Sequence, residues 1–273
     1  EERFKLPDGK VETRKCYRSI YGPVLEFEGN KRGYALLASF WMKEYKNVIG
    51  FFTFNLAKNL AEFEEGVKNI ATNHNFLYAD VEGNIAYWHA GFFPIRQEKH
   101  DSRFPQKGDG SMDWKGIMKF EDIPHAKNPE SGFFQNWNNK PRRDWNFNQR
   151  KIYWGKKIID LLSADKISFE QFKSIAKETA YHCFFADYFK EHLIKRIPID
   201  ALSDDEKKII EELKKWNNQY EAGSPLPIIF TSWVREATIE LVGKSIDVEL
   251  VPSNYRDYLS IALLYAIEVP ERL

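Results

Sequence analysis

The sequence has few cysteines and no excess of charge of either sign. Cys16 and Cys183 are the only cysteines in 273 residues, which excludes a disulfide framework. Lys plus Arg and Asp plus Glu number 40 each, so nothing in the charge favours binding to nucleic acid. No apolar run reaches the roughly 18 residues that a membrane-spanning helix needs. Residues 1–20 are charged and show no signal-peptide pattern. We therefore expect neither nucleic acid nor a membrane as a partner.

The common catalytic motifs are also missing from the sequence. There is no Gly-rich phosphate loop, no nucleophile elbow and no Cys/His set. None of the histidines belongs to a HExxH or paired Cys/His pattern, so the sequence predicts no zinc site. The six are His74, His89, His100, His125, His182 and His192. A carboxylate pair of the glycosidase type is not favoured either, because the spacing of the candidate aspartates singles out no pair. The candidates are Asp80, Asp101, Asp109 and Asp113.

Aromatic side chains, by contrast, are abundant and make up 15% of the chain. This proportion favours a thick hydrophobic core, and it is also compatible with a flat apolar binding surface. The 43% hydrophobic and 29% charged residues are typical of a folded globular protein. The length suffices for one large domain or two modest ones. The chain begins with Glu1 rather than Met, which indicates a fragment or a processed chain.

Residues 1–145 are predicted to consist mainly of sheet and long loops. Asp8-Gly9 is a turn signal, and runs rich in β-branched and aromatic residues follow it. These runs lie at 11–21, 24–27 and 34–38. They predict a short antiparallel set of strands.

A β-hairpin is predicted further along, where residues 75–81 and 85–90 flank the turn sequence Glu82-Gly83-Asn84. Residues 91–132 show no period, and a stretch of that length without regular elements is often functional. Residues 133–137 predict a short aromatic strand.

Helical patterns occur in two parts of the chain. Apolar residues at steps of three and four predict one amphipathic helix from about residue 55 to 70. They are Leu56, Leu60, Phe63, Val67 and Ile70. Residues 146–273 are predicted to be mainly helical, with a capped helix start at Ser168 and further helices at 206–216 and 227–242.

The sequence Asn136-Trp137-Asn138-Asn139-Lys140-Pro141 has two interpretations. Adjacent Asn residues before Pro are common turn chemistry, and composition alone favours that interpretation. Alternatively, a carboxamide held at a strand end donates a hydrogen bond to an oxyanion, which stabilises a transition state by roughly 3 kcal/mol when the donor is pre-positioned.

Six sequence blocks in this region resemble one known family, in its order and spacing. They are YADVEGNIAY at 78–87, GFFPIR at 91–96, HDSR at 100–103, DWKG at 113–116, NPESG at 128–132 and NWNNKP at 136–141. The chain resembles the β chain of the penicillin acylase (penicillin amidase) family of N-terminal-nucleophile hydrolases. Weaker similarity extends back to about residue 21 and forward to the helices near 150–190. One block would be weak evidence, whereas six in register are highly specific.

The resemblance implies an α+β fold, part of an αββα sandwich of antiparallel sheets with helices packed outside. It also implies amide hydrolysis through an acyl-enzyme on an N-terminal Ser, whose own α-amine, with a pKa near roughly 8, serves as the base. By alignment, Asn138 stabilises the oxyanion. Phe51 and His74 correspond to residues that line the acyl pocket. Because a histidine makes that wall more polar, we expect that phenylacetyl is not the preferred acyl group.

The chain departs from the family pattern at important positions. Glu1 has no hydroxyl or thiol, so it cannot be the nucleophile. We interpret residues 1–273 as a central fragment of a β chain that is inactive alone, with the N-terminal part of the β chain and a separate α chain as its partners. Many members bind a structural calcium. The one calcium-binding carboxylate of the family that can be mapped onto this chain corresponds to Asn148-Gln149, where there is no Asp. An amide oxygen can bind Ca²⁺ but contributes no charge, so the sequence leaves calcium binding by the complete protein undecided.

The leading functional hypothesis is hydrolysis of a small-molecule, linear amide. Two alternatives are kept: an acyl-homoserine lactone acylase of the same family, and a non-catalytic binding module that uses its aromatic surface for sugars or peptides. Members of the family are often periplasmic or extracellular, and the sequence itself predicts no compartment.

Overall fold

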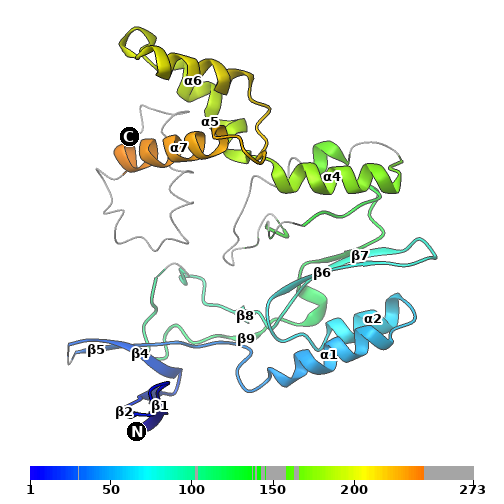
Figure 1. Ribbon diagram of the computed structural model, residues 1–273. Helices are drawn as coiled ribbons and strands as arrows, with labels where there is room; N and C mark the ends of the chain where they lie inside the picture. Colours follow the sequence, from blue (N-terminus) through cyan, green and yellow to red (C-terminus); the bar gives the residue numbers. More distant parts are fainter. Residues whose placement is uncertain are drawn as a thin grey trace. The chain divides into compact units, whose positions relative to one another are not determined.

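The computed structural model divides the chain into two compact units, Glu1–Lys151 and Ile152–Leu273. It describes residues 1–29, 31–101, 104–136, 138, 140–142, 145, 158–162 and 166–242. The first unit holds antiparallel strands and two helices, and the second unit is helical where it is described (Figure 1). The predicted α+β class is therefore confirmed. No helix within the described ranges is both long and apolar enough to cross a membrane.

The first unit begins with two small antiparallel sheets. Its strands are β1 (Glu2–Lys5), β2 (Val11–Arg14), β3 (Arg18–Ser19), β4 (Gly22–Glu28) and β5 (Arg32–Ala35). β1 pairs with β2, and β4 pairs with both β3 and β5. The turn predicted at Asp8-Gly9 is confirmed, because Gly9 has φ +83° and the backbone N–H of Leu6 donates a hydrogen bond to the backbone oxygen of Lys10. Large apolar side chains are exposed on these strands, among them Leu25 and Phe27.

Two helices follow, of which the sequence predicted the second. They are α1 (Tyr45–Leu56) and α2 (Leu60–Val67). The helix predicted from about residue 55 to 70 is confirmed as α2, but it begins later, because the Asn59 side chain accepts a hydrogen bond from the Glu62 backbone N–H and caps the helix there. α1 escaped prediction because its apolar residues are nearly continuous and show no helical period.

The two helices approach closely at glycine. A Cβ placed on Gly50 would lie 2.8 Å from the backbone oxygen of Gly66. The absence of side chains at both positions therefore permits the crossing. Next to it, the rings of Phe54 and Phe63 stack with centroids 4.6 Å apart.

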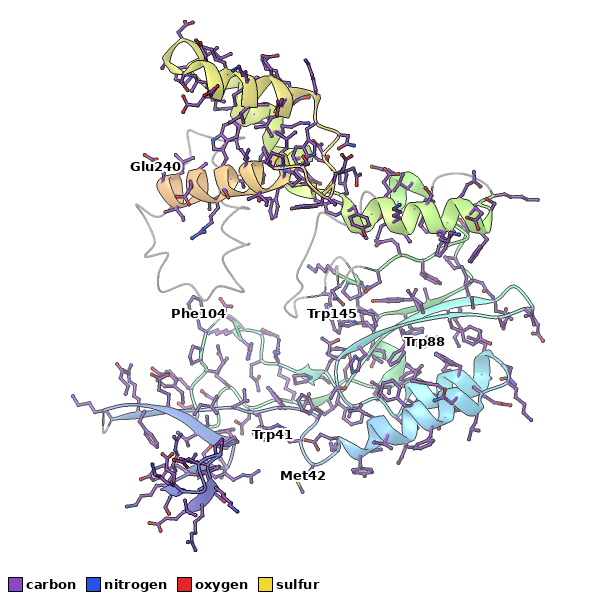
Figure 2. All side chains as sticks on the ribbon, in the orientation of Figure 1. Trp41, Met42, Trp88, Phe104, Trp145 and Glu240 are labelled. Carbon is purple, nitrogen blue, oxygen red and sulfur yellow. The ribbon has the colours of Figure 1, made fainter. Side chains whose placement is uncertain are left out.

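The predicted β-hairpin is confirmed and forms the central sheet of the first unit. It consists of β6 (His74–Ala79) and β7 (Ile85–Ala90), with β10 (His125–Lys127) on the other side of β7. α1 and α2 pack on one face of this sheet (Figure 1). Trp88 is fully buried between that face and the two helices (Figure 2). Because side chains alternate along a strand, the neighbours of Trp88 on β7 face the other side.

The region after the hairpin contains more regular structure than its sequence indicated. Short elements interrupt residues 91–132, in which no period is visible. They are β8 (Pro94–Ile95), β9 (Gly116–Ile117), the 3₁₀ turn η1 (Phe120–Asp122) and β10. The strand predicted at 133–137 is wrong for 133–136, which are not strand, while Trp137 lies outside the described residues. These elements are too short to produce a readable period.

The second unit contains four long helices within its described part, besides a short helical stretch at 158–161. They are α4 (Phe169–Tyr181), α5 (Phe184–Lys195), α6 (Asp204–Lys215) and α7 (Leu226–Val242), with the 3₁₀ turn η2 (Ile199–Ala201) before α6. The capped start predicted at Ser168 is confirmed, since Ser168 and Gln171 form a capping box. Phe189, Leu213 and Phe230 are buried in the shared core of α5, α6 and α7. The part of the predicted helical region at 243–273 lies outside the described residues.

Candidate functional site

Asn138 lies in a turn that is joined to the start of β6. The Nδ2 of Asn75 donates a hydrogen bond to the Oδ1 of Asn138 across 3.1 Å. The backbone N–H of Asn138 donates to the Oδ1 of Asn136 at 3.0 Å, which is an Asx turn. Asn138 itself has φ +54°, a left-handed conformation that Asn tolerates better than most residues. The structure therefore shows turn chemistry at this motif: the Asn136 side chain makes the turn, and Asn138 lies in it.

Asn75 is the centre of a small polar cluster on one face of the hairpin. Its Oδ1 accepts a hydrogen bond from the hydroxyl of Tyr87 at 2.7 Å and lies 2.7 Å from the Nδ1 of His89. The strand register explains this arrangement, because Asn75 pairs with His89 and Tyr87 occupies the next position on the same face. The cluster is therefore produced by the pairing of β6 with β7.

His89 is held neutral by its surroundings. Its side chain is 1% exposed, its ring stacks on Phe93 with centroids 5.0 Å apart, and Trp145 meets it edge-on. Burial lowers the pKa of His89 to about 4. Because the Oδ1 of Asn75 can only accept, the Nδ1 of the neutral imidazole carries the proton and donates it. Burial also raises the pKa of Tyr87, so its hydroxyl remains a donor.

Phe51 and His74, which were predicted to line an acyl pocket, lie close together. Their ring centroids are 6.4 Å apart, and each ring also meets Phe76 edge-on, at 6.3 Å from Phe51 and 6.1 Å from His74. Phe51 is on α1 and the other two are on β6. His74 and Asn75 are consecutive, so their side chains leave β6 on opposite faces. The three predicted site residues thus gather around the first residues of β6, with Asn138 linked to the strand through Asn75.

Sequence reasoning missed Asn75, Tyr87 and His89. His89 was only one of six histidines without a motif, and Asn75 carried no signal of its own. The available signal was the hairpin itself, since a register that pairs positions 75 and 89 brings three polar side chains onto one face. A polar face on a hairpin whose other face is buried could have identified the cluster.

Three of the four aspartates considered as catalytic acids accept hydrogen bonds that explain them as structural residues. Asp80 accepts hydrogen bonds from the Asn84 side chain and from backbone N–H groups of its turn, and these interactions lower its pKa. Asp109 accepts from Ser111, and Asp113 accepts from the Tyr21 hydroxyl. Such contacts are typical of turn and surface carboxylates.

In the described part of the chain, no three His, Cys, Asp or Glu side chains converge as metal ligands. The calcium position suggested by the resemblance, Asn148-Gln149, lies outside the described residues.

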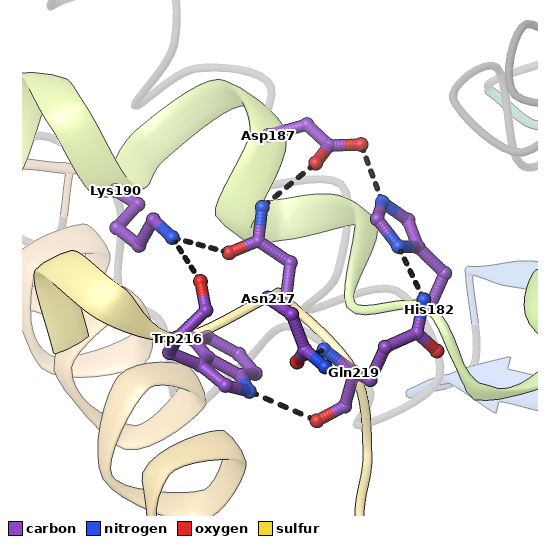
Figure 3. A network of polar contacts seen from close by, with 7 residues as sticks. His182, Asp187, Lys190, Trp216, Asn217 and Gln219 are labelled. Atoms are coloured by element: carbon purple, nitrogen blue, oxygen red, sulfur yellow. Dashed lines mark hydrogen bonds and ion pairs between the residues drawn. The ribbon is translucent and has the colours of Figure 1, made fainter. Parts of the chain in front are cut away.

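The second unit contains a separate polar network around His182 (Figure 3). The Nε2 of His182 lies 2.7 Å from a carboxylate oxygen of Asp187, and the other oxygen of Asp187 accepts from Asn218. Lys190 donates to Asn218 and to the backbone oxygen of Trp216. These bonds tie α5 to the loop that follows α6. The adjacent Cys183 is buried and its pKa is raised by burial, so the thiol is unsuited to act as a nucleophile.

Comparisons with known proteins place these features in context. A family model described as penicillin amidase matches residues 1–268. The chain is 31% identical over 225 residues to penicillin G acylase of Escherichia coli, which covers 80% of this chain and 27% of that protein. Its structure is similar to that of a thermostable penicillin G acylase from Alcaligenes faecalis, with a TM-score of 0.75 and 27% identity over 94% of this chain and 48% of that chain. The chain thus spans less than half the length of either relative.

Proposed function

Because the chain belongs to the penicillin amidase family, we propose that the full-length natural protein hydrolyses linear, non-peptide amide bonds and releases a carboxylic acid and an amine. The observation that carries this proposal is the placement of Asn138. Its carboxamide is presented by a turn, and its Oδ1 is engaged by Asn75. That orientation directs the Nδ2 donor of Asn138 away from Asn75.

The proposed chemistry is acyl transfer. Attack on the amide carbonyl converts its oxygen to an oxyanion, and a donor already in place stabilises this charge more than the ground-state carbonyl. The Nδ2 of Asn138 is that donor. Collapse of the tetrahedral intermediate expels the amine and leaves an acyl-enzyme, which water then hydrolyses.

In this proposal the nucleophile lies outside these 273 residues. The chain spans 27% of its Escherichia coli relative and 48% of the solved Alcaligenes faecalis chain, so most of such a protein lies elsewhere. An N-terminal Ser supplies the attacking oxygen, and its free α-amine takes the proton. The N-terminal part of a β chain and a separate α chain would then complete the site around Asn138.

The acyl group is proposed to bind against the aromatic cluster of Phe51, His74 and Phe76. Phe51 is 45% exposed, so its ring has surface available for an apolar ligand. The imidazole of His74 gives this wall a polar patch beside two phenyl rings. We therefore expect linear aliphatic amides to be hydrolysed faster than phenylacetyl amides. Hydrolysis of the 4-nitroanilides of hexanoic and phenylacetic acid by the full-length protein measures this preference, and a strong phenylacetyl preference would contradict it.

The decisive experiment is Asn138→Ala in the full-length protein. Loss of one pre-positioned oxyanion donor should lower kcat by about two to three orders of magnitude. Asn69→Ala is the matched control, because the Nδ2 of Asn69 donates to a backbone oxygen within the α2 region, away from Asn138. Circular dichroism confirms that both variants fold. A decrease of less than tenfold removes Asn138 from this role.

The same assay separates the alternatives. If hexanoyl-homoserine lactone is hydrolysed far faster than either nitroanilide, the protein is an acyl-homoserine lactone acylase of this family. If the full-length wild type hydrolyses none of the three amides, the proposed hydrolysis is rejected for these acyl classes and the binding-module hypothesis is favoured.

A further inference from the structure

We propose that Asn75 is a positioning residue that fixes the orientation of the Asn138 carboxamide, with Tyr87 and His89 fixing Asn75 in turn. The inference rests on the proposed role of Asn138 and extends it to residues of the β6–β7 hairpin. Asn75 itself does not touch the reacting atoms. Its effect on the reaction is transmitted through one hydrogen bond, from its Nδ2 to the Oδ1 of Asn138.

Two buried side chains contact the side-chain oxygen of Asn75. An amide oxygen has two lone pairs, and the Oδ1 of Asn75 uses them for the Tyr87 hydroxyl and the His89 Nδ1, each at 2.7 Å. In this orientation of the Asn75 amide, Oδ1 faces Tyr87 and His89, and Nδ2 faces the turn that carries Asn138.

Both donors keep their protons near neutral pH. Tyr87 is 7% exposed and His89 is 1% exposed. Burial raises the pKa of the phenol and lowers the pKa of the imidazole, so the hydroxyl stays protonated and the ring stays neutral with one N–H. The aromatic contacts of both rings, with Phe134 and Phe93, limit their rotation.

Asn138 needs such a partner because of where it lies. It is exposed and belongs to a turn rather than to a strand or a helix. The Asx turn holds its backbone N–H but does not determine which end of the side-chain amide faces the substrate. Donation from Asn75 to Oδ1 determines it, since the reversed amide would set NH₂ against NH₂. A site on a loop becomes precise when a rigid element supports it in this way.

The test is a double-mutant cycle of Asn75→Leu and Asn138→Ala in the full-length protein, with the hexanoyl or phenylacetyl 4-nitroanilide that the wild type hydrolyses faster. Asn75→Leu should lower kcat about tenfold and change KM less than about twofold, because the bond matters only when the oxyanion forms. In the Asn138→Ala background the same substitution should change kcat less than about twofold. Asn69→Leu is the matched control, since this half-buried amide donates to a backbone oxygen elsewhere in the first unit.

A second variant preserves the shape of the cluster. Asn75→Asp is nearly isosteric and still accepts from Tyr87 and His89, but its carboxylate cannot donate to Asn138. It should show the same loss in the wild-type background and the same lack of effect in the Asn138→Ala background. If Asn75→Leu does not fold, this variant decides the question.

The outcomes separate the two proposals. If Asn138→Ala lowers kcat less than tenfold, the proposed oxyanion role fails and this inference fails with it. If Asn138→Ala has its full effect but the Asn75 variants lower kcat by the same factor in both backgrounds, Asn75 has a merely structural role and only this inference is overturned. A loss of less than about threefold for both Asn75 variants in the wild-type background also overturns it.

Discussion

Acidification between pH 6.5 and 4 should destabilise the protein through His89. The imidazole is 1% exposed and burial lowers its pKa from 6.5 to about 4. In this pH window the unfolded chain binds a proton at His89 that the folded chain does not bind. The stabilising contribution is therefore complete above pH 6.5 and is lost as the pH falls toward 4. A pKa difference of this size corresponds to a loss of about 3 kcal/mol in the free energy of unfolding.

The measurement compares the full-length wild type with His89→Gln by urea unfolding at several pH values from 7.5 to 4.5. Carboxylates elsewhere contribute equally to both proteins, so the difference between the two profiles isolates the imidazole. The variant is expected to be less stable at pH 7.5, because it loses packing against Phe93, and to lose less stability on acidification. His74→Gln, on the neighbouring strand, controls for removal of an imidazole as such. Parallel profiles for wild type and His89→Gln would refute the reasoning.

Two further predictions concern packing and specificity. Gly50→Ala should lower the free energy of unfolding by about 1–2 kcal/mol, because its Cβ would meet the backbone oxygen of Gly66 at 2.8 Å and this overpacking outweighs the helix-propensity gain of about 1 kcal/mol. Thermal unfolding measures the change, with Asn55→Ala on the exposed side of α1 as the control. Equal stability of the two variants contradicts the argument. His74→Leu should shift the ratio of kcat/KM for the phenylacetyl 4-nitroanilide to that for the hexanoyl 4-nitroanilide about tenfold toward phenylacetyl, because the proposed acyl-binding wall becomes apolar. An unchanged ratio contradicts the proposal that His74 lines this wall.

Local sequence signals predicted the elements that depend on short-range chemistry. The β6–β7 hairpin follows from apolar runs on either side of a Gly-Asn turn, and the start of α4 follows from the capping box at Ser168. Where the signal was interrupted or diluted, the predicted boundary was wrong or the helix was missed. Asn59 begins a new helix inside an apparently continuous apolar period, and α1 has apolar residues on nearly every side.

The candidate site likewise has one part that could be recognised from the sequence and one part that could not. The order and types of residues around Asn138, together with Phe51 and His74, could be recognised from sequence because a family resemblance depends on linear spacing. The partnership of Asn75 with Asn138, 63 positions later in the chain, could not be recognised, because it depends on the register of two strands and on the path of a long loop. The neutral state of His89 likewise depends on burial, since an imidazole has no altered pKa until other side chains exclude water from it.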